Sequence, residues 1–290
     1  MSRIAYVNGR YVAQRQACVS IEDRGYQFGD GIYEVIHVHG GRFVDAELHL
    51  ARFARSMREI SLTPPMSMEA LRPVLAEILR RNRVRDGLVY MQVTRGVARR
   101  DHKFPPPSTR PAFVITAKHG GAFPRDIKAW ACDAITLPDL RWARCDIKSV
   151  NLLPNVLARE EARRQGAYEA ILIDGAGGVT EGAATSVWMV DGEGRLRTRQ
   201  LDQHILPGCT RESLKALLGE SRIGFAEEGF SAEALRGAAE IFLTSATSFV
   251  KPVTRLDGRK VGDGRPGPVT RRLFEMFTRH VEGAAHNLQG

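Results

Sequence analysis

The N-terminal part of the chain alternates apolar and polar residues in short runs, which turn-forming residues separate. Ile4–Val7 and residues 10–12 flank Asn8-Gly9, a pair that favours two-residue turns, so they predict a β-hairpin. Residues 23–31 are rich in glycine and predict a loop. Residues 32–39 alternate with the period of a β-strand.

A period of three to four residues begins at residue 46. Leu50, Phe53 and Met57 recur on one face of a helix, which is predicted over residues 46–60. The same criteria predict a helix at residues 67–81 and strands at residues 87–94 and 111–117. These elements indicate a small α+β domain, residues 1–118. A segment with glycine and proline, residues 119–126, follows it and is expected to be an interdomain linker.

A larger C-terminal domain of mixed α and β structure is predicted over residues 127–290. Its predicted elements are strands at 127–134, 168–174, 182–190 and 240–244, helices at 151–165, 210–218, 231–236 and 269–281, and a hairpin at 253–261. Thr210 is expected to cap the N-terminus of its helix. A formal G-x-G-x-x-G pattern at Gly262, Gly264 and Gly267 is crowded by prolines, so it predicts a surface turn.

Composition excludes several classes of protein. With 290 residues, of which 43% are hydrophobic, the chain can bury a core in one large domain or two smaller ones. We find no apolar signal segment at the N-terminus and no apolar run near the roughly 20 residues of a membrane helix. The four cysteines are widely spaced and have no histidine cluster nearby, which predicts no metal site and free thiols in a reducing cytoplasm.

The formal net charge of +9 raises the possibility of a nucleic-acid-binding protein. The basic residues are mostly arginines spread through helical patterns, without a recognition motif or an aromatic platform. We therefore expect a solvated basic surface that attracts small anionic substrates, and no nucleic-acid partner. A basic nucleic-acid-binding protein on a retired enzyme scaffold remains the alternative of a different class.

Residues 144–153, R-C-D-I-K-S-V-N-L-L, contain a single lysine just before a helical pattern. Lys148 is either a solvated charge, the common fate of lysine, or an amine held inward between Ile147 and Val150. In the second case, desolvation favours the neutral amine, a nucleophile for carbonyl compounds. Two other segments bear on this choice: V-T-E-G at residues 179–182 and E-D-R-G-Y-Q-F-G-D-G-I-Y-E-V at residues 22–35.

Together these three segments resemble those of the fold-type IV pyridoxal-phosphate enzymes, and most closely the bacterial D-amino acid transaminases. The resemblance covers essentially the whole chain, and its motifs keep the family's order. It implies a two-domain α+β fold of type IV, with a small N-terminal α/β domain and a larger C-terminal mixed α/β domain. The cofactor, pyridoxal 5′-phosphate, would lie in the cleft between them. The resemblance also implies a homodimer.

The resemblance assigns chemical roles to two residues. It implies that Lys148 forms the Schiff base with the cofactor and moves the proton between the substrate Cα and the cofactor C4′. It implies that Glu181, in the T-E-G run, keeps the pyridinium nitrogen protonated, so that the ring can accept electrons. Without the resemblance, Glu181 would be interpreted as an exposed carboxylate after a turn.

Three segments are implied to bind the cofactor phosphate. Arg52 lies on the first predicted helix, where only the resemblance selects it over Arg55. The start of the helix after Gly208 offers backbone N–H groups and a dipole that favour an anion. A loop of small residues is the third part. The implied set of phosphate ligands is Arg52, Cys209, Thr210, Ser245, Ala246 and Thr247.

The resemblance further implies a trap for the substrate carboxylate, formed by Tyr33, Arg100 and His102. Arginine binds carboxylates through two parallel hydrogen bonds, and the other two side chains add donors. Because the proton arrives from a fixed face of the cofactor, the pocket that holds the carboxylate decides the handedness of the product. Read alone, the segment is a basic surface loop, and Arg99 leaves open which guanidinium faces the substrate.

The implied activity is transfer of an amino group by a ping-pong mechanism. The donors and acceptors would be D-amino acids such as D-alanine and D-glutamate and 2-oxo acids such as pyruvate and 2-oxoglutarate. The alternatives are a branched-chain L-amino acid or (R)-amine transaminase and an aminodeoxychorismate lyase, against which the Arg100–His102 pair argues. Ala183, Ala184 and Ala246 depart from the family pattern by lacking side-chain donors, which puts cofactor affinity and substrate range in question.

Overall fold

The computed structural model describes residues 3–120, 123–219, 221 and 223–286. The chain divides into two compact units. The first contains the N-terminal part up to Phe123 and, in addition, the segment Ile147–Asn151. The second contains Pro124–Asp146 and Leu152–Gly283. The division after Phe123 lies inside the segment expected to be a linker, of which Gly121 and Ala122 fall outside the described residues.

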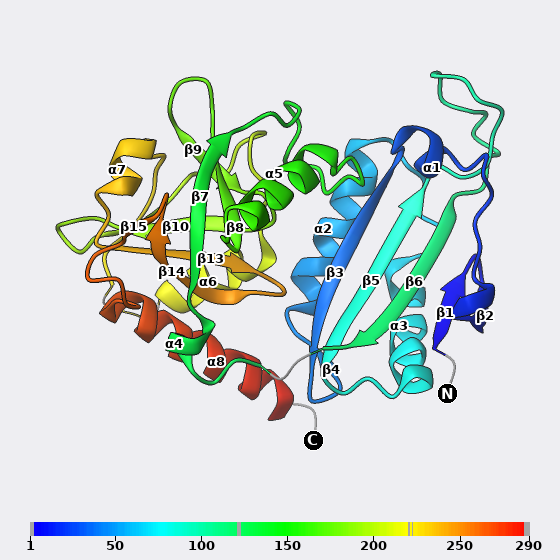
Figure 1. The fold of residues 1–290 in the computed structure, drawn as a ribbon. Coiled ribbons are helices and arrows are strands. Elements are labelled where there is room, and N and C mark those ends of the chain that lie inside the picture. Colours follow the sequence, from blue (N-terminus) through cyan, green and yellow to red (C-terminus); the bar gives the residue numbers. More distant parts are fainter. Residues whose placement is uncertain (1–2, 121–122, 220, 222, 287–290) are drawn as a thin grey trace. The chain divides into compact units, whose positions relative to one another are not determined.

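The first unit is built on a six-stranded antiparallel sheet with the strand order β2-β1-β6-β5-β3-β4 (Figure 1). Its strands are β1 (Ile4–Val7), β2 (Arg10–Ala13), β3 (Gly31–His39), β4 (Arg42–Phe43), β5 (Gly87–Thr94) and β6 (Ala112–His119). The predicted N-terminal hairpin is confirmed, with Tyr6 opposite Tyr11 and a short 3-10 helix, η1 (Gln14–Gln16), after it.

Two helices, α2 (Ala46–Glu59) and α3 (Met68–Asn82), pack on one face of this sheet (Figure 1). Strand periodicity turns Ile32 and Ile36 of β3 toward the helices, where both are fully buried. The helical period turns Phe53 and Met57 of α2 into the same core. Both predicted helices are therefore confirmed, with ends that differ from the expectation by one residue.

The prediction of a loop at residues 23–31 is wrong in part, because α1 (Arg24–Phe28) forms there. The Asp23 side chain accepts a hydrogen bond from the backbone N–H of Gly25 at 2.8 Å and so caps the helix. Gly29 ends it in the left-handed conformation with φ of 67°. A five-residue helix is too short to leave a periodic signal, although both caps are visible in the sequence.

The second unit contains a nine-stranded mixed sheet with the order β12-β11-β10-β13-β14-β7-β8-β9, and β15 pairs with β14. The strands are β7 (Cys132–Pro138), β8 (Glu169–Ile173), β9 (Val179–Gly182), β10 (Ser186–Val190), β11 (Leu196–Thr198), β12 (Phe225–Glu227), β13 (Glu240–Ser245), β14 (Phe249–Leu256) and β15 (Arg259–Lys260). The helices are α4 (Ile127–Trp130), α5 (Leu153–Arg164), α6 (Cys209–Gly219), α7 (Ala232–Arg236) and α8 (Pro268–His286). β7 and β8 are parallel, and α5 lies between them in the chain.

Three expectations for this unit are corrected. The strand predicted at residues 127–134 begins only at Cys132, because Asp126 caps a turn of helix with its side chain on the N–H of Lys128. The strand predicted at residues 182–190 is two strands, β9 beside β8 and β10 beside β13. Thr210 is not the cap of α6, because the helix already begins at Cys209. No helix in the described part of the chain is long and apolar enough to span a membrane.

Candidate active site

Lys148 lies in the segment Ile147–Asn151, which runs beside the start of β3 in the first unit. The backbone N–H of Tyr33 donates to the Lys148 carbonyl at 3.0 Å. The Lys148 Nζ lies 4.3 Å from the centroid of the Tyr33 ring, a favourable cation–π geometry. Lys148 is half-buried, so the ring holds the amine against β3. Of the two alternatives, this favours the amine held inward.

A close backbone approach fixes the end of this segment. The Asn151 side chain donates from Nδ2 to the Gly29 carbonyl at 3.3 Å. A Cβ at Gly29 would lie 2.1 Å from the Asn151 Oδ1, and the residue has φ of 67°. The left-handed φ favours glycine here, and a Cβ would in addition displace the Asn151 side chain. The turn that ends α1 therefore also sets the position of the lysine segment.

Tyr33 projects from the face of β3 opposite to Ile32 and Glu34, by strand alternation. Its ring stacks on that of Tyr90 in the neighbouring strand, with 5.7 Å between the centroids. The Tyr90 hydroxyl donates to the Gln92 Oε1 at 2.7 Å. Burial raises the pKa of Tyr90 to about 12, so this phenol stays protonated. Tyr33 is thus held rigidly between an aromatic ring and the Lys148 amine.

Arg52 of α2 is buried against Glu34 of β3. Its Nε donates to the Glu34 Oε2 at 2.9 Å and its Nη2 to Oε1 at 2.6 Å, and the His49 ring nitrogen lies 2.9 Å from the same Oε1. Burial alone would raise the pKa of Glu34, but Arg52 and His49 together lower it well below its usual range. Glu34 therefore fixes the orientation of Arg52. Arg55, the competing candidate, makes a longer pair with Glu59 at 3.9 Å.

Glu181 in the second unit is buried, with 8% of its side chain exposed, which excludes the exposed carboxylate expected from the residue alone. Its Oε1 accepts from the Arg141 Nη1 and its Oε2 from the backbone N–H of Leu206 at 3.1 Å. Burial raises the pKa of Glu181 to about 7, and the Arg141 guanidinium opposes that rise. The pKa of this carboxyl is about 7 even with Arg141 beside it, so a second cation near it would favour its ionised form.

The segment that binds Glu181 leads directly into the N-terminus of α6. Gly208 precedes this helix, and a Cβ there would lie 2.8 Å from the Ser186 Oγ. Ser186 is in register with Thr244, the neighbour of Ser245. Cys209 and Thr210 are buried in the first turn of α6. The N-terminus of α6 thus lies close to Ser186, and free backbone N–H groups at a helix N-terminus suit an anion such as a phosphate.

The third expected phosphate segment is a tight turn at the end of β13. The Ser245 Oγ accepts from the backbone N–H groups of Thr247 at 3.3 Å and Ser248 at 3.0 Å. Ala246 and Ser245 are half-buried, and Thr247 is exposed. Phe249 then has φ of 55°, unusual for a residue with a side chain. The donors of the second unit, together with the Glu181 carboxylate, fit the phosphate and ring nitrogen of pyridoxal phosphate.

Arg100 and His102 lie on an exposed loop of the first unit, and both contact the ring of Phe28 at the end of α1. The guanidinium carbon of Arg100 is 5.0 Å and the His102 ring 5.5 Å from its centroid. The Arg24 side chain anchors the loop by donating to the Asp101 carbonyl at 2.6 Å. Within the described part of the chain, these contacts bring Arg100 and His102 together but run to Phe28 and not to Tyr33.

Sequence reasoning missed three residues that contact the predicted site residues or hold their partners. Glu34 is not among the predicted site residues, although an ionisable residue on the buried face of a strand signals an internal partner for a cation. Arg141, which pairs with Glu181, and Asp139, which pairs with Arg141, follow β7 in a segment without periodicity. The only signal for them is a charged pair two residues apart after an apolar strand.

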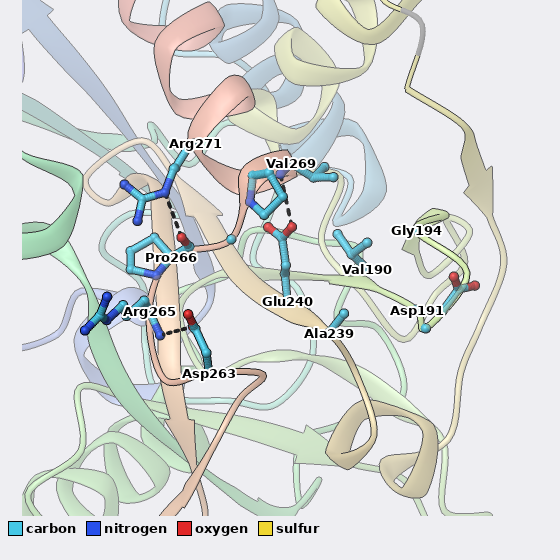
Figure 2. Close-up of a pocket in the computed structure, with 13 residues that line it drawn as sticks. Val190, Asp191, Gly194, Ala239, Glu240, Asp263, Arg265, Pro266, Val269 and Arg271 are labelled. Carbon is cyan, nitrogen blue, oxygen red and sulfur yellow. Dashed lines mark hydrogen bonds between the residues drawn. The ribbon is translucent and has the colours of Figure 1, made fainter.

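A separate pocket of the second unit is lined by Glu240 (Figure 2). Glu240 begins β13, whereas Ser245 ends that strand. The buried Glu240 carboxylate accepts there from the backbone N–H groups of Val269 at 3.0 Å and Thr270 at 2.7 Å, and so caps α8. A Cβ at Gly267 would lie 2.1 Å from the Glu240 side chain. The formal glycine pattern therefore forms the turn that packs on this cap, as the surface-turn interpretation predicts.

Comparison with known proteins places these residues in context. Residues 31–256 match the family Amino-transferase class IV. The D-alanine aminotransferase of Staphylococcus haemolyticus is 43% identical over 277 residues, which cover 96% of this chain and 97% of that protein. The D-alanine aminotransferase of Listeria innocua is 39% identical and covers 98% of both chains.

Solved structures give the same fold. The branched-chain amino acid aminotransferase of Escherichia coli superposes with a TM-score of 0.89 at 26% identity, covering 100% of this chain and 98% of that one. The branched-chain aminotransferase of the archaeon Thermoproteus uzoniensis, solved with norvaline, has a TM-score of 0.86 at 24% identity, covering 99% and 97% of the two chains. The expected α+β fold of type IV is confirmed.

Proposed function

Because the chain belongs to the class IV aminotransferase family, whose members use pyridoxal 5′-phosphate, we propose that it transfers amino groups between D-amino acids and 2-oxo acids. The observation that carries this proposal is the 39–43% identity to D-alanine aminotransferases over nearly the whole chain. D-Alanine and D-glutamate are the expected donors, and pyruvate and 2-oxoglutarate the expected acceptors. The bound cofactor supplies an electron sink for the substrate Cα.

In this proposal Lys148 is the residue that binds the cofactor covalently and moves the proton at the substrate Cα. Its position over the Tyr33 ring, 4.3 Å from the centroid, supports this role because it restricts the amine to one side of β3. An aromatic face also stabilises the ammonium form that follows proton uptake. Tyr33, stacked on Tyr90, cannot turn away without breaking that stack.

Glu181 would hold the proton on the ring nitrogen of the cofactor. Its burial and its ion pair with Arg141 support this role, because a carboxylate in a dry site favours a protonated partner. We propose that Arg52, held by Glu34, contributes a positive charge to the phosphate. The remaining phosphate ligands in this proposal are Cys209, Thr210, Ser245, Ala246 and Thr247.

The carboxylate of the substrate would bind to Tyr33, Arg100 and His102. The contacts of Arg100 and His102 with one ring, that of Phe28, support a shared role because they fix two donors side by side. Arg100 and not Arg99 has this contact, so we assign the bidentate interaction to Arg100.

Beyond the site, we propose a cytoplasmic homodimer with no nucleic-acid partner. Leu153, Val156 and Leu157 of α5 support the dimer, because these side chains at helical spacing are 68%, 57% and 62% exposed. The absence of disulfides among the four cysteines, all of which are described, agrees with a reducing compartment. The domain division 1–118, 119–126 and 127–290 is part of the same proposal.

One second candidate has a specific observation in its favour. The structures that superpose well include branched-chain amino acid aminotransferases, so an L-specific branched-chain activity is the competing hypothesis. The sequence favours the D-specific enzymes, with 43% identity against 26%. We retain (R)-amine transaminase and aminodeoxychorismate lyase activities only as outcomes of the test.

A competition between donors tests the proposal. Purified enzyme with pyridoxal phosphate is given equal D-alanine and L-leucine with 2-oxoglutarate, and the two 2-oxo acid products are quantified. We expect pyruvate to form in large excess. Exclusive formation of 4-methyl-2-oxopentanoate would establish the branched-chain alternative. A protein that binds no cofactor and converts neither donor would support a retired scaffold.

A further inference from the structure

Asp139, Arg141 and Glu181 form a buried charge cluster, in which the functional proposal assigns no role to Asp139. The Arg141 Nε and Nη2 donate to the two carboxylate oxygens of Asp139 at 2.9 and 2.7 Å, and Nη1 donates to Glu181. The side chains of Asp139, Arg141 and Glu181 are 10%, 6% and 8% exposed. Solvent therefore screens this cluster little.

Each member of the cluster is held in place by a further hydrogen bond. The Thr180 hydroxyl donates to the Asp139 Oδ2 at 2.7 Å, and Thr180 precedes Glu181 on β9. The Arg141 Nη2 also donates to the His204 carbonyl at 3.2 Å. The Leu206 N–H donates to the Glu181 Oε2. Fixed partners on all three side chains indicate a preorganised arrangement, not a mobile surface ion pair.

The charges in the cluster do not balance. One guanidinium faces two carboxylates, so the ionised cluster carries one net negative charge in a buried place, which is unfavourable without a counter-charge. Cys145 is another titratable group near Glu181, and burial raises the pKa of its thiol to about 12, so it remains neutral. The Asp146 carboxylate is already paired with Arg144 at 2.9 Å.

We propose that Asp139 is a positioning residue that cancels the charge of Arg141, so that Arg141 orients Glu181 without neutralising it for the ring nitrogen of the cofactor. This inference rests on the proposed function. If Arg141 faced Glu181 alone, their charges would cancel and the site would have no net attraction for a pyridinium cation. With Asp139 present, one negative charge remains for that cation. The Thr180 hydroxyl keeps Asp139 turned toward Arg141.

Ring-labelled pyridoxal phosphate tests this inference directly, because nitrogen-15 NMR of the holoenzyme reports the protonation of the ring nitrogen as pH is raised. We expect Asp139→Asn to lower the pH of proton loss by about one unit or more, a tenfold loss of proton affinity. Its kcat should fall on the order of tenfold, while KM changes by less than about threefold. Asp133→Asn on β7 is the matched control, since the pair of Asp133 with Arg255 is exposed. This variant should change neither the pH of proton loss nor kcat.

The double variant Asp139→Asn/Arg141→Gln separates charge from structure. It restores one net negative charge, so the pH of proton loss should move back toward that of the unmodified enzyme. If Asp139 had a purely structural role, the second substitution would lower the pH of proton loss further. Arg141→Gln alone should leave that pH unchanged or raise it, and this variant decides the question if Asp139→Asn does not fold.

Several results would overturn the inference. The first is that Asp139→Asn leaves the pH at which the ring nitrogen loses its proton unchanged. The second is that this pH is lower in the double variant than in Asp139→Asn. The third is that Arg141→Gln alone lowers it. An unmodified enzyme that transaminates while its ring nitrogen is unprotonated throughout would refute the inference and leave the proposed function intact. An unmodified enzyme that binds no pyridoxal phosphate would refute both.

Discussion

At the scale of single residues, Lys148 is the side chain on which the proposed chemistry depends. It is half-buried over the Tyr33 ring, so its amine is confined where most lysines are solvated. Borohydride reduction of the holoenzyme, followed by peptide mapping, should attach the cofactor to Lys148. A label on Lys118, Lys128 or any other lysine would show that the assignment is wrong.

Glu181→Gln tests the partner of the ring nitrogen. A neutral amide keeps the shape of the carboxylate and can accept from one of its two donors, Arg141 or Leu206, but it cannot hold the pyridinium proton, so the electron sink weakens. We expect a folded variant that retains most cofactor binding and loses most activity, with kcat reduced by roughly a hundredfold. Turnover close to that of the unmodified enzyme would exclude Glu181 from this role.

The titration of Glu181 also makes a prediction for the apoenzyme. Its pKa is raised from the ordinary 4.5 to about 7, chiefly by burial, so the folded state favours the neutral form. The stability that this carboxyl contributes is therefore fully present below pH 4.5 and is lost as pH rises toward 7. Urea unfolding of the apoenzyme should show that Glu181→Gln gains stability relative to the unmodified chain over this interval. A constant difference between pH 4.5 and 7 would contradict the raised pKa.

At the scale of elements, the loop that carries Arg100 and His102 is expected to decide substrate class. Arg100→Ala removes a charge-assisted bidentate contact worth about 1.5–3 kcal/mol. Catalytic efficiency toward D-amino acids should fall roughly tenfold to a hundredfold, whereas an amine without a carboxylate should be much less affected. Arg99→Ala is the matched control, because Arg99 lacks the contact with Phe28 that Arg100 makes. Equal losses in both variants would remove the basis for choosing Arg100.

The elements that could be predicted from the sequence are those whose burial follows a simple period. β5 matches the prediction at both ends, because its alternate residues face one core. α1 and α4 could not be predicted, since five and four residues contain too few turns for a periodic signal. Their formation depends on local capping by Asp23 and Asp126. The segments around these caps are glycine-rich and β-prone, so their composition predicts a loop and a strand instead.

The same limit applies to the site. Lys148 and Glu181 are predicted from the motifs that surround them, but the groups that set their environment lie far away in sequence. Arg141 is 40 residues from Glu181, and Arg52 is 18 residues from Glu34. Charge pairs between residues so far apart give no periodic signal in the sequence. The local sequence of each element does not determine which residues of another element it will contact.

At the scale of the whole molecule, the proposed dimer is open to measurement. Three neighbouring apolar side chains on α5 are exposed, and burial of such a patch against a second copy would be favourable. Sedimentation velocity at micromolar concentration should give twice the mass of one chain. Leu157→Glu should weaken association, whereas Arg163→Glu on the same helix, at a side chain that is 72% exposed, should not. A monomer under these conditions would contradict the proposal.

The handedness of the product tests the central claim most directly. The unmodified enzyme with bound pyridoxal phosphate is given pyruvate and racemic glutamate, and the alanine formed is separated by chiral chromatography. A D-specific carboxylate trap predicts that D-alanine forms and that only D-glutamate is consumed. Formation of L-alanine, with L-glutamate as the consumed donor, would contradict the account.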